Sequence, residues 1–158
     1  MTVDFRAKRR SVAMNEIAHE GLVSALLVGE YGNDGSLVRD VCLQHGWLLF
    51  EASDVCRAMG MLQSGAVQVV IAEGGSASAG WQRLLDALRD LPDPPQLVVT
   101  SRTADDFLWS EVLNRGGYDV LPRPLNRDEV ERVIAGAGRH FRALRGELPR
   151  TLATRTAA

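Results

Sequence analysis

Four short apolar runs in this 158-residue chain each end in a side chain that can bind a charged group. Glu30 and Glu73 end two of the runs, and Thr100 and Arg123 end the other two. If the runs are parallel strands, their ends meet in the crevice where an open α/β sheet usually carries its chemistry. Carboxylates are ligands for Mg²⁺, and a guanidinium can form two parallel hydrogen bonds with a carboxylate. The sequence therefore predicts one polar site with two acids, a hydroxyl and a guanidinium.

Alternating strands and helices are needed to bring these four ends together. Short apolar runs predict strands over about 23–29, 47–50, 67–72, 96–100 and 118–121. The amphipathic stretches that follow them predict helices that begin near Ser36, Ser53, Trp81, Thr103 and Asn126. Parallel strands need helical crossovers, which are right-handed, so the pattern indicates a parallel sheet covered by helices on both faces.

Capping residues and apolar spacing define the helices further. Ser53 and Thr103 are good N-cap residues, and Asn126 with Glu129 three residues later resembles a capping box. The positions expected to be buried are Trp81, Leu84, Leu85 and Leu88 in the third helix, Phe107, Leu108 and Val112 in the fourth, and Val130, Val133, Ile134, Ala137 and Phe141 in the last.

Length and composition fit one domain, because 46% of the residues are hydrophobic. We expect an extension over 1–21, a domain over 22–146 and a flexible tail over 147–158. No apolar run approaches the roughly 20 residues of a membrane span, and the start of the chain lacks the apolar region of a secretory signal. We therefore expect a cytoplasmic protein. No effector domain is recognisable, so we expect its output to pass through a partner.

The net charge of −2 is unevenly distributed. Residues 1–21 and 139–158 are net basic, and the part between them is net acidic, which argues against a nucleic-acid-binding surface on the domain. The basic stretch over 6–10 could contact nucleic acid, but such a short charge run is usually solvated chain. Lys8 is the only lysine, so an arginine in a place where another protein has lysine can simply reflect composition.

Other candidate groups show no pattern of a metal or cofactor site. Cys42 and Cys56 lie in helical patterns without ligand spacing, so we expect small buried residues rather than ligands or a disulfide. The three histidines (His19, His45 and His140) are scattered, and we assign none of them a catalytic role. The small-residue loop 74–80 lacks the lysine and spacing of a phosphate-binding loop.

The arrangement of these elements resembles the receiver domain of bacterial response regulators. Thr100 ends the fourth strand, and Arg123-Pro124 follows the fifth. The segment 116–125 is similar to that family's stretch between the fourth and fifth helices, and 51–54 is similar to the end of its second strand. The resemblance covers roughly 23–144. It implies a flavodoxin-like (βα)5 doubly wound sheet with strand order 2-1-3-4-5.

The resemblance also implies positions for the family's metal and phosphoryl sites. In receivers, an acidic pair after the first strand and an aspartate ending the third hold Mg²⁺, and that aspartate accepts a phosphoryl group from a kinase histidine. The acidic pair falls on Gly29 and Glu30, so one acid is missing. The phosphoacceptor falls on Glu73, or on Ala72 if the following loop has the family's commoner length.

The phosphoryl-contacting residues are also only partly matched. The family's hydroxyl falls on Thr100, its lysine on Arg123 before Pro124, and its aromatic switch residue on Val120; only Thr100 matches. Glutamate at position 73 has one extra methylene, and misplacing a reacting group by about 1 Å can cost about 100-fold in rate. We therefore expect no catalytic residue, no cofactor and at most a weak Mg²⁺ site, with no enzymatic activity.

Each of these residues also has a plainer interpretation. Glu73 could be a solvated loop acid, Thr100 a residue chosen for its strand preference, and Arg123 a consequence of the lysine-poor composition. Alternatively, Arg123 could pair with Glu73 as a permanent internal substitute for the phosphoryl contact. That interpretation predicts an ion pair between the two side chains, and the resemblance predicts a cis Arg123–Pro124 peptide bond.

We favour a receiver-like signalling module that has a degenerate phosphorylation site and works through protein contacts in a phosphorelay-type pathway. Its partner would be a histidine kinase or a downstream effector, with no nucleic acid or membrane partner. Two alternatives remain: a receiver that is still phosphorylated through its altered acids, or a flavodoxin-like domain that binds a small ligand over loop 74–80. Self-association would use the fourth helix, fifth strand and fifth helix.

Overall fold

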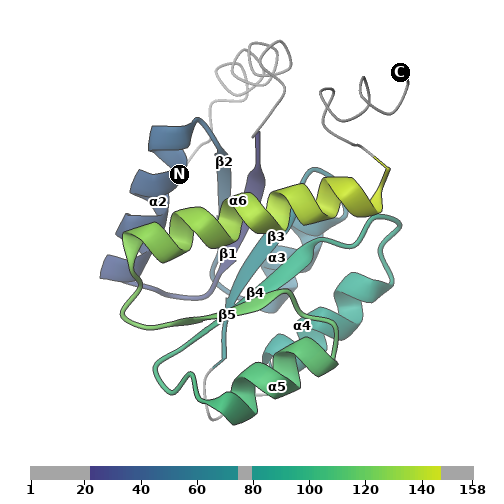
Figure 1. The fold of residues 1–158 in the computed structure, drawn as a ribbon. Coiled ribbons are helices and arrows are strands. Elements are labelled where there is room, and N and C mark those ends of the chain that lie inside the picture. The colour runs from purple at the N-terminus through teal and green to yellow at the C-terminus, as the bar shows by residue number, and fades with distance from the viewer. Residues whose placement is uncertain (1–21, 75–79, 147–158) are drawn as a thin grey trace, which may run out of the picture.

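The computed structural model describes residues 22–74 and 80–146, in which strands and helices alternate along the chain (Figure 1). The strands are β1 (Ser24–Val28), β2 (Leu48–Ala52), β3 (Val69–Glu73), β4 (Gln96–Ser101) and β5 (Asp119–Pro122). The helices are α2 (Asn33–His45), α3 (Val55–Leu62), α4 (Gly80–Arg89), α5 (Asp106–Asn114) and α6 (Arg127–Leu144). The residues of the expected extension, 1–21, and of the expected tail, 147–158, lie outside the described part of the chain.

The strands form one parallel sheet in the order β2-β1-β3-β4-β5, which confirms the predicted flavodoxin-like topology. The chain reverses its direction of travel across the sheet between β1 and β3, so the carboxyl ends of these strands border the crevice at the topological switch point. The register pairs Val28 with Ala72 and Glu73 with Thr100. Glu73, Thr100 and Arg123, at the ends of β3, β4 and β5, therefore lie on the same side of this switch point.

Two apolar layers hold the helices against the sheet. α2 and α6 cover one face, and α3, α4 and α5 cover the other (Figure 1). Successive residues of β1 alternate between the two layers: Ala25 and Leu27 belong to the first, and Leu26 and Val28 to the second. This is why β1 is an unbroken apolar run rather than an alternating one.

Most of the predicted buried positions are confirmed. Those in α4 (Trp81, Leu84, Leu85 and Leu88) and in α6 (Val130, Val133, Ile134, Ala137 and Phe141) are buried. The predicted burial of Phe107 is wrong, because 76% of its surface is exposed. The inward face of α5 runs through Val112 and the partly buried Leu108, and Phe107 projects away from it. Cys42 is buried as predicted, whereas Cys56 is exposed because α3 turns Ala58 and Leu62 inward.

Three helix starts differ from their predicted positions. α2 begins at Asn33 rather than near Ser36, because its first turn is polar and carries no apolar periodicity. The caps of α3 and α5 are aspartates, not the hydroxyl residues Ser53 and Thr103. Asp54 accepts a hydrogen bond from the Arg57 amide, and Asp105 accepts one from the Leu108 amide. Aspartate caps as well as serine or threonine does, so composition alone could not choose between neighbouring cap residues.

The last helix is capped where the sequence predicted it to be. The Asn126 side chain accepts a hydrogen bond from the Glu129 amide, 3.2 Å long, as in the expected capping box. α6 then runs for 18 residues along the sheet. None of the helices within the described ranges combines the length and the apolar composition that crossing a membrane requires.

Candidate functional site

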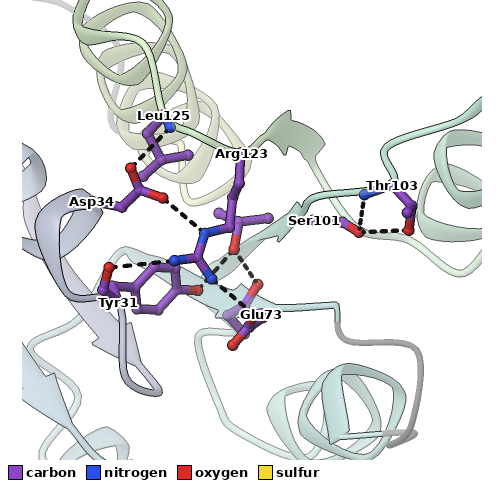
Figure 2. A network of polar contacts seen from close by, with 9 residues as sticks. Tyr31, Asp34, Glu73, Ser101, Thr103, Arg123 and Leu125 are labelled. Atoms are coloured by element: carbon purple, nitrogen blue, oxygen red, sulfur yellow. Dashed lines mark hydrogen bonds and ion pairs between the residues drawn. The ribbon is translucent and has the colours of Figure 1, made fainter.

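Arg123, which follows β5, lies at the centre of a polar cluster at the carboxyl edge of the sheet (Figure 2). Its Nε donates to Asp34 Oδ2 and one terminal nitrogen donates to Glu73 Oε1, both at 2.8 Å. The other terminal nitrogen donates to the Tyr31 carbonyl at 3.3 Å. Only 7% of the Arg123 side chain is exposed. The guanidinium is therefore held on three sides, by two carboxylates and one carbonyl.

The two predictions made for this arginine agree with the structure. The Arg123–Glu73 ion pair is present, and the Arg123–Pro124 peptide bond is cis. The pairing with Glu73 uses one nitrogen rather than the expected two parallel hydrogen bonds, because Asp34 takes the neighbouring one. Val120, at the position of the family's aromatic residue, is an apolar side chain buried in the layer under α5.

Asp34, in the first turn of α2, is the second carboxylate of the cluster. One of its oxygens accepts from Arg123, and the other accepts from the Leu125 backbone amide at 3.1 Å (Figure 2). Burial alone would raise the pKa of Asp34, but these two hydrogen bonds outweigh burial and hold that pKa below its ordinary value. Asp34 thus ties the start of α2 to the segment between β5 and α6.

The carboxylates of Asp34 and Glu73 also change the pKa of the Arg123 guanidinium. Burial alone would lower the pKa of Arg123, but the adjacent Asp34 and Glu73 raise it above its ordinary value. The arginine is therefore a permanent cation, matched by two nearby acids.

Tyr31 joins the charged cluster to Thr100 on β4. Its ring lies under the Arg123 guanidinium, with 4.8 Å between the guanidinium carbon and the ring centre, a cation–π geometry. Its hydroxyl shares a 3.0 Å hydrogen bond with the Thr100 hydroxyl. Both residues are buried, and burial raises the pKa of the Tyr31 hydroxyl well above its ordinary value. Tyr31 therefore stays protonated and able to donate.

The predicted acidic pair does not lie in this cluster. Glu30 is exposed, and within the described residues it makes no hydrogen bond or ion pair with the cluster. Its expected place in the crevice is taken by Asp34, which the helix start at Asn33 brings inward. Gly29 has φ +118°, which disfavours any side chain, and a Cβ there would lie 3.5 Å from the Tyr31 ring. An acid at position 29 would therefore strain this loop.

The carboxylates present do not fit a Mg²⁺ site of the receiver kind. Mg²⁺ requires several oxygen ligands in near-octahedral geometry. Asp34 and Glu73 instead direct oxygens at Arg123, whose positive charge would repel a metal ion between them. Among residues 22–74 and 80–146, no cluster of three or more histidines, cysteines or acids is placed to hold a metal ion. The described residues of this cluster therefore do not form a Mg²⁺ site of the receiver kind.

Sequence reasoning missed Tyr31 and Asp34. Both lie in the stretch 29–35, where three glycines interrupt the chain directly after a buried strand. Such a stretch is a common place for functional residues, since loops at the carboxyl ends of strands approach the crevice. An aromatic residue between two glycines and an acid three residues later were the available signals. Of the small-residue loop 74–80, residues 75–79 lie outside the described chain.

Comparison with solved structures identifies the fold. The signal receiver domain of a putative Luxo repressor protein from Vibrio parahaemolyticus matches with a TM-score of 0.68 and 16% identity, over 77% of this chain and 94% of that one. The signal receiver domain of an HD domain-containing protein from Pseudomonas fluorescens Pf-5 matches with a TM-score of 0.69 and 20% identity, over 81% and 95%. The chain has the receiver fold.

A receiver domain from a yeast also has this fold. The receiver domain of the Saccharomyces cerevisiae response regulator Ssk1, in a complex with the histidine phosphotransfer protein Ypd1, matches with a TM-score of 0.66 and 14% identity, over 75% of this chain and 90% of that one. Neither models of protein families nor curated proteins give a match. The similarity to these receiver domains is therefore one of fold, at 14–20% sequence identity.

Proposed function

We propose that this protein is a receiver-like signalling module whose phosphorylation site is replaced by an internal ion-pair cluster, and that it acts through protein contacts in a two-component or phosphorelay-type pathway. The main observation in support of this function is the position of the Arg123 guanidinium. All of its nitrogens already donate to Asp34, Glu73 and the Tyr31 carbonyl. Three of the five N–H groups of this arginine are therefore already committed within the protein, and its charge already faces two carboxylates.

The charges of the cluster support a non-phosphorylated module. Phosphoryl transfer to a carboxylate depends almost entirely on positioning and electrostatic stabilisation. Here the acids that would hold the metal are paired with Arg123, and Glu73 has the longer side chain. A carboxylate carries one negative charge, whereas a phosphorylated side chain carries about −1.5 to −2. The Glu73–Arg123 pair would therefore hold a surface only partly like that of an activated receiver.

Incubation with Mg²⁺ and acetyl phosphate, followed by intact-mass measurement, tests this proposal. We expect no gain of a phosphoryl group. The runner-up function, a receiver still phosphorylated through Glu73, is favoured by one observation: 40% of that side chain is exposed, so a donor could reach it. A stoichiometric gain of one phosphoryl group that is abolished by Glu73→Gln would overturn the proposal and establish the runner-up.

We also propose a protein-binding surface formed by α5, β5 and α6. Trp109 and Leu113, four residues apart on α5, are 41% and 46% exposed. Charges of both signs accompany them on this surface: Asp105, Asp106, Glu111, Arg115, Arg127, Asp128 and Arg132. Such a surface could pair with itself across a two-fold axis or bind a histidine kinase or a downstream effector.

Sedimentation velocity tests the two-fold version of this surface. A specific dimer should bury about 800 Å² on each partner, and Trp109→Glu should dissociate it. Leu43→Glu is the matched control, because it places the same charge on an exposed apolar residue of α2, outside the proposed surface. Sedimentation as a monomer at high concentration, or equal loss of the dimer in both variants, would contradict self-association through this face.

A further inference from the structure

We propose that Tyr31 is the positioning residue that couples the acid cluster to α5, in place of an aromatic residue on β5. The inference rests on the proposed function, since it describes how that same site would control the protein-binding surface. Tyr31 comes from the loop between β1 and α2, so this residue follows an interior strand of the sheet rather than the edge strand β5.

Thr100 depends on Tyr31 for the shorter of its two side-chain hydrogen bonds. This residue is fully buried, and its hydroxyl shares a 3.0 Å hydrogen bond with the Tyr31 hydroxyl. Its other contact, to the Ala72 carbonyl, is 3.5 Å long, at the limit for a hydrogen bond. Val120 has no polar group to offer. A buried hydroxyl left unpaired is costly, so Tyr31 fixes the orientation in which Thr100 is satisfied.

Tyr31 also contacts the charged cluster around Arg123. Its ring lies beneath Arg123 and its carbonyl accepts from that guanidinium, so one residue contacts both Arg123 and Thr100. Positive-φ glycines on either side, Gly29 at +118° and Gly32 at +56°, shape the loop that presents it. A rearrangement of the cluster would therefore move the Tyr31 ring and, with it, the partner of Thr100.

The segment from Thr100 to Asp105 joins β4 to the start of α5. The next residue, Ser101, is buried; its hydroxyl accepts from the Thr103 amide at 3.1 Å and lies 3.3 Å from the Thr103 hydroxyl (Figure 2). Asp105 then caps α5 by accepting from the Leu108 amide. These short-range contacts connect the Tyr31–Thr100 pair to the start of the helix that carries the proposed protein-binding surface.

Tyr31→Phe, which removes only the hydroxyl, tests the coupling by amide hydrogen exchange. We expect about fivefold or faster exchange over residues 101–108, since an unpaired buried hydroxyl favours local opening there. Tyr118→Phe is the matched control: Tyr118 is a partly buried tyrosine directly before β5, and its ring lies beside that of His140. It should leave exchange over 101–108 unchanged.

A double-mutant cycle separates coupling from a general loss of stability. Thr100→Val removes the same hydrogen bond from the other side, so adding Tyr31→Phe to it should change exchange over 101–108 by less than twofold. Independent, multiplying effects of the two substitutions would overturn the proposal. So would a uniform acceleration across the protein, or none, in Tyr31→Phe.

Two variants of Thr100 test the same coupling without changing Tyr31. If Tyr31→Phe does not fold, Thr100→Ser, which keeps the hydroxyl, should exchange like the wild type over 101–108 while Thr100→Val should not; equal behaviour would refute the coupling. Because the exchange is measured on the protein alone, its outcome is independent of the acetyl phosphate experiment. A phosphorylated protein with intact coupling would overturn only the proposed function, and an unphosphorylated one without coupling only this inference.

Discussion

Replacing Arg123 by methionine should destabilise the fold by about 3–5 kcal/mol, the range for breaking a buried ion pair by removing one partner. Methionine keeps much of the aliphatic length and removes the charge and all three hydrogen bonds. The largest loss is the bond to Asp34, because the two side chains are only 7% and 14% exposed. A hydrogen bond to a charged group in such a place is worth about 1.5–3 kcal/mol.

The remaining contacts of Arg123 contribute less. The pair with Glu73 is partly screened, since 40% of the Glu73 side chain is exposed, so it adds about 0.5–1 kcal/mol. The 3.3 Å bond to the Tyr31 carbonyl and the contact with its ring add about 0.5–1 kcal/mol each. These amounts together lie near the range given for the whole substitution.

Urea denaturation at pH 7 measures the change, and Arg127→Met is the matched control. Arg127 forms ion pairs with Asp40 and Glu131, but its side chain is 39% exposed, so its loss should cost less than about 1 kcal/mol. Adding Asp34→Asn to Arg123→Met should cost little more, because it removes the unpaired charge. Equal, small losses in both single variants would refute the buried-cluster argument.

Further tests concern Asp34, the two cysteines and Gly117. The pKa of Asp34 is lowered in the folded protein, so its stabilising effect is complete above about pH 4 and is lost as the pH falls through that lowered pKa; the stability difference between wild type and Asp34→Asn should shrink below pH 4 in urea denaturation. Cys56 should react with a thiol reagent in the native protein, whereas Cys42, whose pKa burial raises to about 12, should react only after denaturation, and two fast native thiols would contradict the burial. Gly117→Ala should cost about 1–3 kcal/mol in thermal denaturation, because its Cβ would lie 2.5 Å from a Val112 methyl; an unchanged midpoint would mean that α5 yields easily.

The order of the strands and helices could be predicted from the sequence, because the hydrophobic pattern of each segment is visible in the sequence itself and because few strand orders are compatible with the connections between the segments. The buried run in β1 and the stripe through α4 are visible as apolar periods, and right-handed crossovers then leave few ways to order the strands. The same reasoning placed Glu73 and Arg123 at the ends of two strands that face one crevice, with β4 between them. Their ion pair follows from that placement and from the length of the two side chains.

What only the tertiary structure decided is which side chains reach the crevice from the loops. Glu30 lies two residues after the end of β1 and was the predicted acid, yet it is exposed, while Asp34 enters the crevice from the first turn of α2. That exchange depends on the backbone of Gly29 and Gly32, whose positive φ values no hydrophobic period encodes. Tyr31 could become the partner of Thr100 only because this loop folds back under the arginine. The hydrophobic pattern of the sequence predicts where the strands end. The positions of the loop side chains depend instead on the backbone dihedral angles and on the charged groups that these side chains contact.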